Sequence, residues 1–219
     1  MRRGHVLGVS KPPIRVAVLS PQPIVAEGLR AILASTSGRV EVVELDHDQP
    51  EPDVVLYDAI SLLRGDTSDL DILVNETASA VLVVSRELRP GLAAEALAAG
   101  ADGHISLGAD RPDILEALDS AVTGWQVGDE GASPVVGSMG STSGQALVGG
   151  DRGLSPRETE ILALVGQGLS NTEIAGELYL SPNTVKTYIR TAYRKINATK
   201  RADAGAWAVT HGLAEAPSA

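Results

Sequence analysis

The first 126 residues alternate short apolar runs, rich in β-branched residues, with segments of helical periodicity. The apolar runs predict strands at residues 14–19, 40–45, 54–57, 80–84 and 104–106. The helical pattern predicts helices at residues 24–35, 90–99 and, after the N-cap candidate Asp110, 112–123; the segments after the second and third strands are poorly periodic. Strands that alternate with helices indicate a parallel sheet covered on both faces. We therefore expect a doubly wound, five-stranded α/β domain over residues 12–126.

Residues 127–152 have no sustained apolar period and are rich in Gly, Ser and Thr. This composition predicts a flexible linker, because it offers little apolar surface to bury. We expect the domains on either side of the linker to move relative to each other.

Residues 153–213 show only helical periodicity, with clear signals for helix starts. Ser155 and Ser170 begin capping-box sequences, Ser181 is a further cap followed by Pro, and Thr199 is a candidate cap for the last helix. The predicted helices span residues 156–167, 171–178, 182–196 and 200–211. Three residues join the second helix to the third, which is typical of a helix-turn-helix. We therefore expect a separate all-α, four-helix domain.

The charge of the chain is distributed unevenly between these regions. The net charge is −10, yet residues 1–127 carry 10 Lys and Arg against 19 Asp and Glu, whereas residues 153–219 carry 7 against 6. Between Leu178 and Ala202 every charged residue is basic. A cationic segment in an otherwise acidic chain indicates that the two domains have different partners.

Several classes of protein are excluded by composition. No apolar run reaches the roughly 18 residues that a membrane-spanning helix needs. The chain has no cysteine, and its four histidines are scattered without metal-ligand spacing. We expect a cytoplasmic protein that does not contact a membrane and that has no metal site and no cofactor.

The predicted helix at residues 182–196 has two different faces. The apolar face is expected to pack into a core and contains Val185, Ile189, Ala192 and Ile196. The opposite face is basic and rich in hydrogen-bonding groups, and it contains Asn183, Lys186, Thr187, Arg190 and Arg194. A charged helix face is usually no more than a solvated surface, but such a surface mixes both signs of charge. A purely basic face favours binding to nucleic acid.

The major groove of DNA presents guanine acceptor atoms to Arg and Lys, between two rows of phosphates. Side chains on the first turns of the helix are the candidates for base contacts: Lys186, Thr187 and Arg190. Candidates for phosphate contacts lie further along, or near helix N-termini where backbone N–H groups also bind anions: Asn171, Thr184, Arg194, Lys195, Lys200 and Arg201. The sequence thus predicts a double-stranded DNA partner.

Three segments of this region resemble the LuxR/NarL-type DNA-binding domain over about residues 153 to 213. They begin at Leu154 (LSPRETEIL), Gly168 (GLSNTEIA) and Leu180 (LSPNTVKTY). The resemblance implies a four-helix module whose third helix enters the major groove of promoter DNA and whose last helix pairs with a second copy. It also implies base contacts at the three positions selected above and a homodimer.

Residues 14–124 resemble the receiver domain of response regulators, which implies a sheet of flavodoxin-like order. The resemblance is carried by the segments VLSPQPIVAEGLR from Val18, PDVVLYD from Pro52 and GADGHISL from Gly100. The family has a phosphoacceptor Asp, a pair of acids that hold Mg²⁺, a Thr or Ser, and a Lys. Asp58 and Ser85 match this pattern. The other positions depart from it: Ser20 and Pro21 replace the acid pair, Leu107 replaces the Lys, and His104 stands at the usual aromatic position.

These departures change the expected mechanism. A single carboxylate is a poor Mg²⁺ site, and without the Lys no fixed cation grips the phosphate. We therefore predict an atypical receiver that acts by dimerisation, or by binding a small ligand or a partner protein, without phosphorylation of Asp58. Conventional control by phosphorylation of Asp58 is one alternative. The other is a protein-interaction partner of another regulator that does not read DNA.

An enzyme is not expected, and no residue is predicted to be catalytic. Asp58, Ser85 and His104 are expected near the same edge of the predicted sheet, and such residue types can form a hydrolytic triad. However, Ser85 lacks the Gly-x-Ser-x-Gly turn, and strand alternation is expected to direct His104 away from it.

Overall fold

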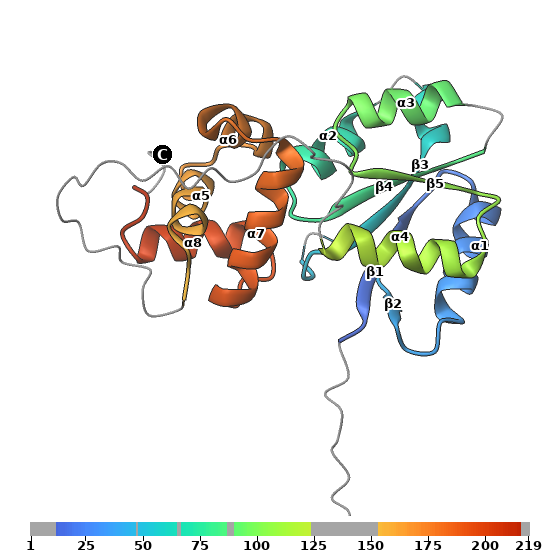
Figure 1. Cartoon of the computed structure of the whole chain (residues 1–219), viewed down its shortest axis with the longest axis horizontal. Helices are drawn as coiled ribbons and strands as arrows, with labels where there is room; N and C mark the ends of the chain where they lie inside the picture. Colours follow the sequence, from blue (N-terminus) through green and yellow to red (C-terminus); the bar gives the residue numbers. More distant parts are fainter. Residues whose placement is uncertain (1–11, 47, 65–66, 87–89, 124–152, 216–219) are drawn as a thin grey trace, which may run out of the picture.

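The computed structural model describes residues 12–46, 48–64, 67–86, 90–123 and 153–215. They form an α/β domain (residues 12–123) and a helical domain (residues 153–215), which lie side by side in Figure 1. Residues 127–152, where the sequence predicts a linker, lie outside the described residues. None of the described helices is long and apolar enough to cross a membrane.

The α/β domain is built on a five-stranded parallel sheet of order β2-β1-β3-β4-β5, which confirms the expected flavodoxin-like order. The strands are β1 (Ile14–Leu19), β2 (Val40–Val42), β3 (Val54–Asp58), β4 (Ala80–Ser85) and β5 (Gly103–Ser106). β2 is shorter than predicted. The chain leaves the sheet after Val43, whose N–H donates to the Val16 carbonyl, and Leu45, predicted to lie in the strand, is 46% exposed.

Helices cover both faces of this sheet. One face of the sheet is covered by α1 (Pro23–Ala34) and α4 (Arg111–Thr123). The other face is covered by η1 (Ala59–Arg64), α2 (Ser68–Asn75) and α3 (Pro90–Ala98). Burial on both faces explains why β3 and β4 are continuous apolar runs. Asp110 caps α4 as predicted, since its carboxylate accepts from the N–H of Asp113. The described residues between β2 and β3 form no helix.

The helical domain contains α5 (Pro156–Gly166), α6 (Asn171–Leu178), α7 (Pro182–Ile196) and α8 (Arg201–Thr210). Both predicted capping boxes are present, and Ser181 caps α7 by accepting from the N–H of Thr184. The prediction for Thr199 was wrong. The N-cap of α8 is Lys200, and Thr199 instead donates its hydroxyl to the carboxylate of Asp203.

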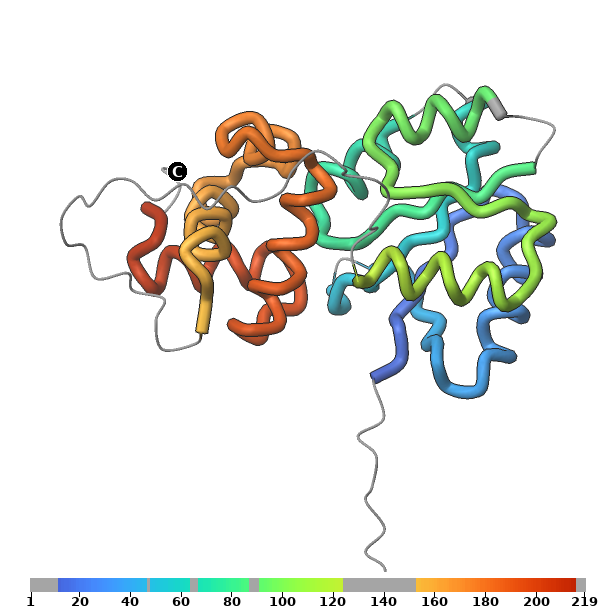
Figure 2. The backbone as a smooth tube through the Cα atoms, viewed as in Figure 1, coloured from blue at the N-terminus to red at the C-terminus, as the bar shows by residue number. Residues whose placement is uncertain are grey.

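The two domains meet at the amino-terminal edge of the sheet. The α/β domain contributes the segments that precede β3, β4 and β5 and the C-terminal ends of α2 and α4. The helical domain contributes α6, α7 and the start of α8, and the tube in Figure 2 shows α7 facing the sheet. Ala78, just before β4, belongs to the core of the helical domain. The carboxyl ends of the strands, including Asp58, lie at the opposite edge.

Candidate nucleic-acid interface

The amphipathic pattern of α7 folds as the sequence predicts. Its apolar face is buried in the core of the helical domain, where Val185, Ile189 and Ala192 are fully buried and Ile196 is nearly so. The short turn from α6 positions this helix. Tyr179 adopts a left-handed conformation (φ 54°) at the end of α6, which reverses the chain two residues before the Ser181 cap. The basic face is thereby directed away from the helical core.

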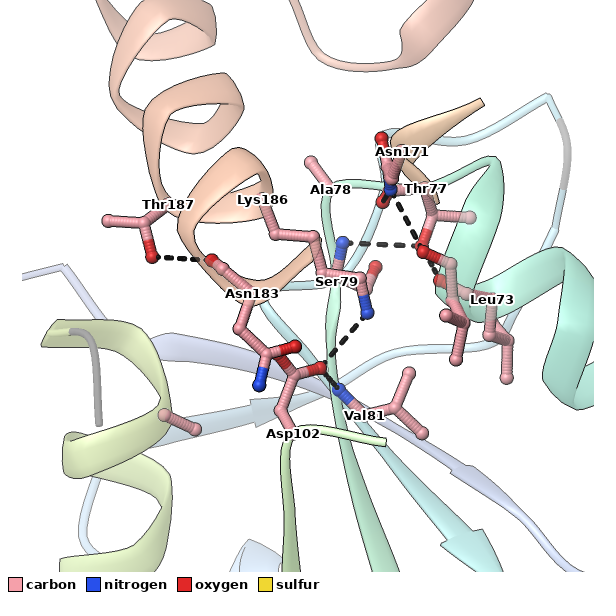
Figure 3. Close-up of polar contacts among 12 residues, drawn as sticks. Leu73, Thr77, Ala78, Ser79, Val81, Asp102, Asn171, Asn183, Lys186 and Thr187 are labelled. Carbon is pink, nitrogen blue, oxygen red and sulfur yellow. Dashed lines mark hydrogen bonds and ion pairs between the residues drawn. The ribbon is translucent and has the colours of Figure 1, made fainter. Parts of the chain in front are cut away.

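Lys186, a predicted base-contacting residue, is covered by the α/β domain. Its side chain is 0% exposed, and its Nζ atom lies 3.0 Å from Oδ2 of Asp102, whose side chain is 8% exposed (Figure 3). The same Asp102 oxygen accepts a hydrogen bond from the backbone N–H of Val81 at 2.7 Å. Burial lowers the pKa of Lys186, while the charge of Asp102 opposes that effect. A desolvated ion pair therefore joins α7 to the turn before β5.

Arg190 is held by the same surface. Its Nη1 atom donates to the Ala121 carbonyl at 2.7 Å, and its Nε atom donates to the Lys186 carbonyl. Ala121 lies in the last turn of α4, where carbonyls lack helical partners and carry partial negative charge. Burial lowers the pKa of Arg190, and Asp102 and Asp53 raise it. Thr187 differs from both cations, because it is exposed and its hydroxyl donates to the Asn183 carbonyl within α7.

Asn171 is also used between the domains. Its side chain is completely buried, and its amide donates to the carbonyls of Val74 and Thr77 at 2.9 and 2.8 Å (Figure 3). Its carbonyl oxygen accepts from Nη1 of Arg201. Asn171, selected as a phosphate contact, thus bonds groups of the α/β domain and cannot contact DNA while the domains remain joined, and Arg201 has its Nε atom 3.7 Å from Oε2 of Glu76. We call this arrangement, with α6 and α7 packed against the α/β domain, the closed arrangement.

Glu51 is a member of the interface that sequence reasoning missed. Its carboxylate accepts from the backbone N–H groups of Ala78 and Arg201, both at 2.8 Å. Its own N–H donates to the Thr199 carbonyl at 2.9 Å. Burial raises the pKa of Glu51, against the effect of these hydrogen bonds and of the Arg201 charge. Glu51 joins the segment before β3 to the start of α8.

The remaining predicted phosphate contacts lie on more open parts of the helical domain. Arg194 is exposed, and the Thr184 hydroxyl bonds that of Ser181. Lys195 pairs with both carboxylate oxygens of the buried Glu158 at 2.7 and 2.9 Å, which gives it a structural contact inside the helical domain. Lys200 is partly buried.

The predicted receiver pocket is assembled at the carboxyl edge of the sheet. Asp58 is 4% exposed, and both of its carboxylate oxygens are engaged: Oδ2 accepts from the Ser20 hydroxyl at 2.6 Å and Oδ1 from the Ile60 N–H at 3.0 Å. Among the described residues, no group of three or more His, Cys, Asp and Glu could hold a metal ion. The Mg²⁺ of receiver domains does not fit this donor set, because Ser20 and Pro21 stand in place of its acids.

His104 lies beside Ser85, contrary to the prediction. Its Nε2 atom is 2.8 Å from the Ser85 hydroxyl oxygen. In the parallel register β5 pairs His104 with Val83, which places it on the face shared by Val83 and Ser85. Leu107 lines a cavity of about 210 Å³ with Asp58 and Ser85. The carboxylate of Asp58 bonds Ser20 and Ile60, so these residues do not form a Ser-His-Asp relay.

A receiver-like α/β domain joined to a tetrahelical helix-turn-helix domain is the architecture of a two-domain response regulator. Residues 152–208 match the family described as bacterial regulatory proteins, luxR family. The chain is 31% identical over 210 residues to a probable transcriptional regulatory protein NarL of Mycobacterium tuberculosis, covering 91% of this chain and 95% of that protein. The chain belongs to the NarL-type response regulators of the LuxR family. It is a DNA-binding transcriptional regulator and not an enzyme.

Further relatives also match over nearly the whole length of both chains. The nitrate/nitrite response regulator protein NarL of Escherichia coli is 26% identical over 204 residues, which cover 89% of this chain and 94% of that protein. Among solved structures, the RcsB response regulator of Salmonella typhimurium is 20% identical, with a TM-score of 0.40, over 91% of this chain and 100% of that chain.

Proposed function

We propose that this protein binds promoter DNA in the cytoplasm as a homodimer, on paired half-sites, through the basic face of α7 once the α/β domain has moved away from it. In the DNA-bound dimer, bases are contacted by Lys186, Thr187 and Arg190. Arg194, Thr184, Lys195, Lys200, Arg201 and Asn171 are the candidates for phosphate contacts. The closed arrangement is the inactive state, and separation of the domains precedes binding.

The burial of Lys186 carries this proposal. A side chain that is 0% exposed cannot reach a base edge, so DNA and the α/β domain compete for the same face of α7. Binding to DNA then includes the free energy of breaking the Lys186–Asp102 pair and the Asn171 bonds. Any signal that binds one arrangement more tightly shifts the balance between them.

We further propose that this signal is not phosphorylation of Asp58. The Ser20 hydroxyl occupies one carboxylate oxygen of Asp58, and Leu107 supplies no cation for a phosphoryl group. The domains also meet at the other edge of the sheet. A small ligand or a partner protein on the α/β domain fits these observations better than phosphoryl transfer.

The test of DNA reading is selection of binding sites from a random-sequence duplex library by the full chain carrying Asp102→Asn, which favours the open form. We expect a two-fold symmetric motif whose binding weakens steeply with salt. Adding Arg190→Ala to the same chain is the matched control and should abolish enrichment. Failure to enrich any motif would support the interaction-only alternative instead.

The test of phosphorylation uses intact-mass measurement after incubation with acetyl phosphate or phosphoramidate and Mg²⁺. We expect no more phosphoryl adduct on the full chain than on Asp58→Ala. Stoichiometric labelling that Asp58→Ala abolishes would establish conventional control.

A further inference from the structure

A cavity of about 300 Å³ lies between the two domains, separate from the pocket at Asp58. The α/β domain supplies one wall from the start of β1 and from Pro50 to Asp53. α7 supplies the opposite wall with Arg190, Tyr193 and Arg194. Its size is at the lower end of the range for small-molecule sites.

Tyr193 gives this cavity an unpaired hydrogen-bonding group. The residue is 6% exposed, and its hydroxyl has no hydrogen-bond partner within the part of the chain that the structure describes. Burial raises the pKa of Tyr193, reinforced by the nearby charge of Glu51, so the phenol stays protonated and can donate. Buried hydroxyls in native proteins are nearly always paired. The hydroxyl oxygen is itself enclosed, so an acceptor atom of a ligand would satisfy it after a local shift of the cavity wall.

The charges around the cavity favour an anion. Arg15, Arg190 and Arg194 line the cavity, and none of these three arginines lies within ion-pair distance of a carboxylate among the described residues. Arg15 donates from Nη1 to the carbonyls of Pro50 and Glu51, and Arg190 also donates to carbonyls. Carbonyl oxygens satisfy N–H groups without neutralising the positive charge.

The wall also contains two carboxylates, which offset part of this charge and leave one positive charge in excess, since three arginines face Glu51 and Asp53. Asp53 accepts from the backbone N–H of Arg15 at 2.8 Å, and Glu51 accepts from two backbone N–H groups. The rest of the lining is apolar and includes Pro12, Pro50, Pro52 and Val122. The cavity therefore combines an apolar surface with guanidinium groups and a phenol donor.

We propose that this cavity binds a small organic anion, with an apolar body and one carboxylate or phosphate group, and that this ligand holds the closed arrangement. The proposal rests on the proposed function in one respect, that the closed arrangement excludes DNA. Because the walls come from both domains, the site exists only when they are joined. A ligand at 100 times its Kd would favour the closed arrangement about 100-fold and weaken DNA binding by up to that factor.

Binding is tested on the full chain without DNA, by calorimetric titration with benzoate, phenylacetate and phenyl phosphate and with the neutral controls benzamide and benzyl alcohol. We expect at least one anion to bind and its neutral counterpart to bind at least tenfold more weakly. Tyr193→Phe keeps the ring and removes only the hydroxyl, and Arg15→Gln removes a cation that DNA reading does not use. Both should weaken binding of the anion at least fivefold, while the ligand-free melting temperature of Tyr193→Phe stays equal or rises.

Three results would overturn the proposal: no binding of any anion, equal binding of the neutral controls, or binding that Tyr193→Phe leaves unchanged. The second readout is the DNA affinity of the wild-type chain, which should fall when the anion is added and should fall less in Tyr193→Phe at the same anion concentration. Unchanged DNA affinity with a bound anion would also contradict the regulatory effect. If the chain with Asp102→Asn selects no DNA motif, the proposed function fails, whereas the binding titrations still decide whether the site exists.

Discussion

The Nζ atom of Lys186 lies 3.0 Å from Oδ2 of Asp102, and this ion pair joins α7 to the α/β domain that covers it. Both side chains are desolvated, and the cost of removing two charges from water offsets much of the attraction within such a pair. Removing one partner is costly, however, because the other charge is left buried without compensation.

Replacing Asp102 with Asn should open the molecule. The variant keeps an oxygen that can accept from Val81, but it leaves the Lys186 ammonium unpaired, at a cost of about 3–5 kcal/mol to the closed arrangement. We expect DNA affinity at least tenfold above wild type, measured by fluorescence anisotropy on the selected duplex. Asp113→Asn, an exposed acid in the first turn of α4, is the charge-matched control. Equal affinities of wild type and Asp102→Asn would contradict a DNA-blocking role for the closed arrangement.

Glu51 makes the closed arrangement sensitive to pH. Burial raises its pKa there above the ordinary 4.5, so protonation favours closure. The stabilisation of the closed arrangement by protonated Glu51 is complete below the ordinary pKa and is lost as pH rises through the raised pKa. Arg201 and Asp203 face the group, with Arg201 lowering its pKa and Asp203 raising it.

We therefore expect DNA affinity to fall as pH decreases from about 7 to about 5, and this dependence to flatten in Glu51→Gln. The comparison is made as the ratio of the two affinities at each pH, which cancels titration of groups common to both chains. A slope that is the same in wild type and Glu51→Gln would rule out Glu51 as its source.

The Ser20 hydroxyl stabilises Asp58 in the α/β domain. It donates a 2.6 Å hydrogen bond to a carboxylate that is 4% exposed. Ser20→Ala should lower the free energy of unfolding by about 1.5–3 kcal/mol, as expected for hydrogen bonds to charged groups. Urea denaturation would measure this loss, with Ser35→Ala as a control that removes an exposed hydroxyl bonded only within its own helix region. Equal losses in the two variants would show that the bond to Asp58 contributes nothing specific.

Tyr179 places a side chain where the backbone is left-handed. Its φ is 54° and its side chain is 96% exposed, so little packing compensates for the conformation. Tyr179→Gly should stabilise the helical domain by about 1 kcal/mol, whereas Tyr179→Val should destabilise it. Melting temperatures of the two variants would be compared. A lower melting temperature for Tyr179→Gly than for Tyr179→Val would show that the aromatic ring matters more than the backbone conformation.

The elements with strong local signals could be predicted from the sequence. The caps at Ser155, Ser170 and Ser181 depend on residues three positions away, and the apolar face of α7 follows from its period. By contrast, α2 was not predicted because only Leu70, Leu73 and Val74 of its eight residues are buried. β2 was overestimated because apolar residues continue past the point where the neighbouring strand stops pairing.

The candidate DNA-reading residues were predicted as a set, but their surroundings were not. Lys186 and Asp102 are 84 positions apart. An acid in a short segment with glycines on both sides, such as Asp102, is typical of a solvated loop. Glu51 stands between two prolines without any pattern that indicates burial. His104 was misplaced because its orientation depends on the register of β4 and β5, which a four-residue strand does not specify. Contacts between domains follow from the folded surfaces, and no local period encodes them.

The edge of the sheet that carries Asp58 and the edge that contacts α7 are separated by the length of a strand, roughly 15 Å. Residues beside Asp58, such as Ser20 and Leu107, can therefore differ from the receiver pattern without changing the contacts that α7 makes at the opposite edge. The residues around Asp58 and the residues that cover α7 can therefore change independently of each other.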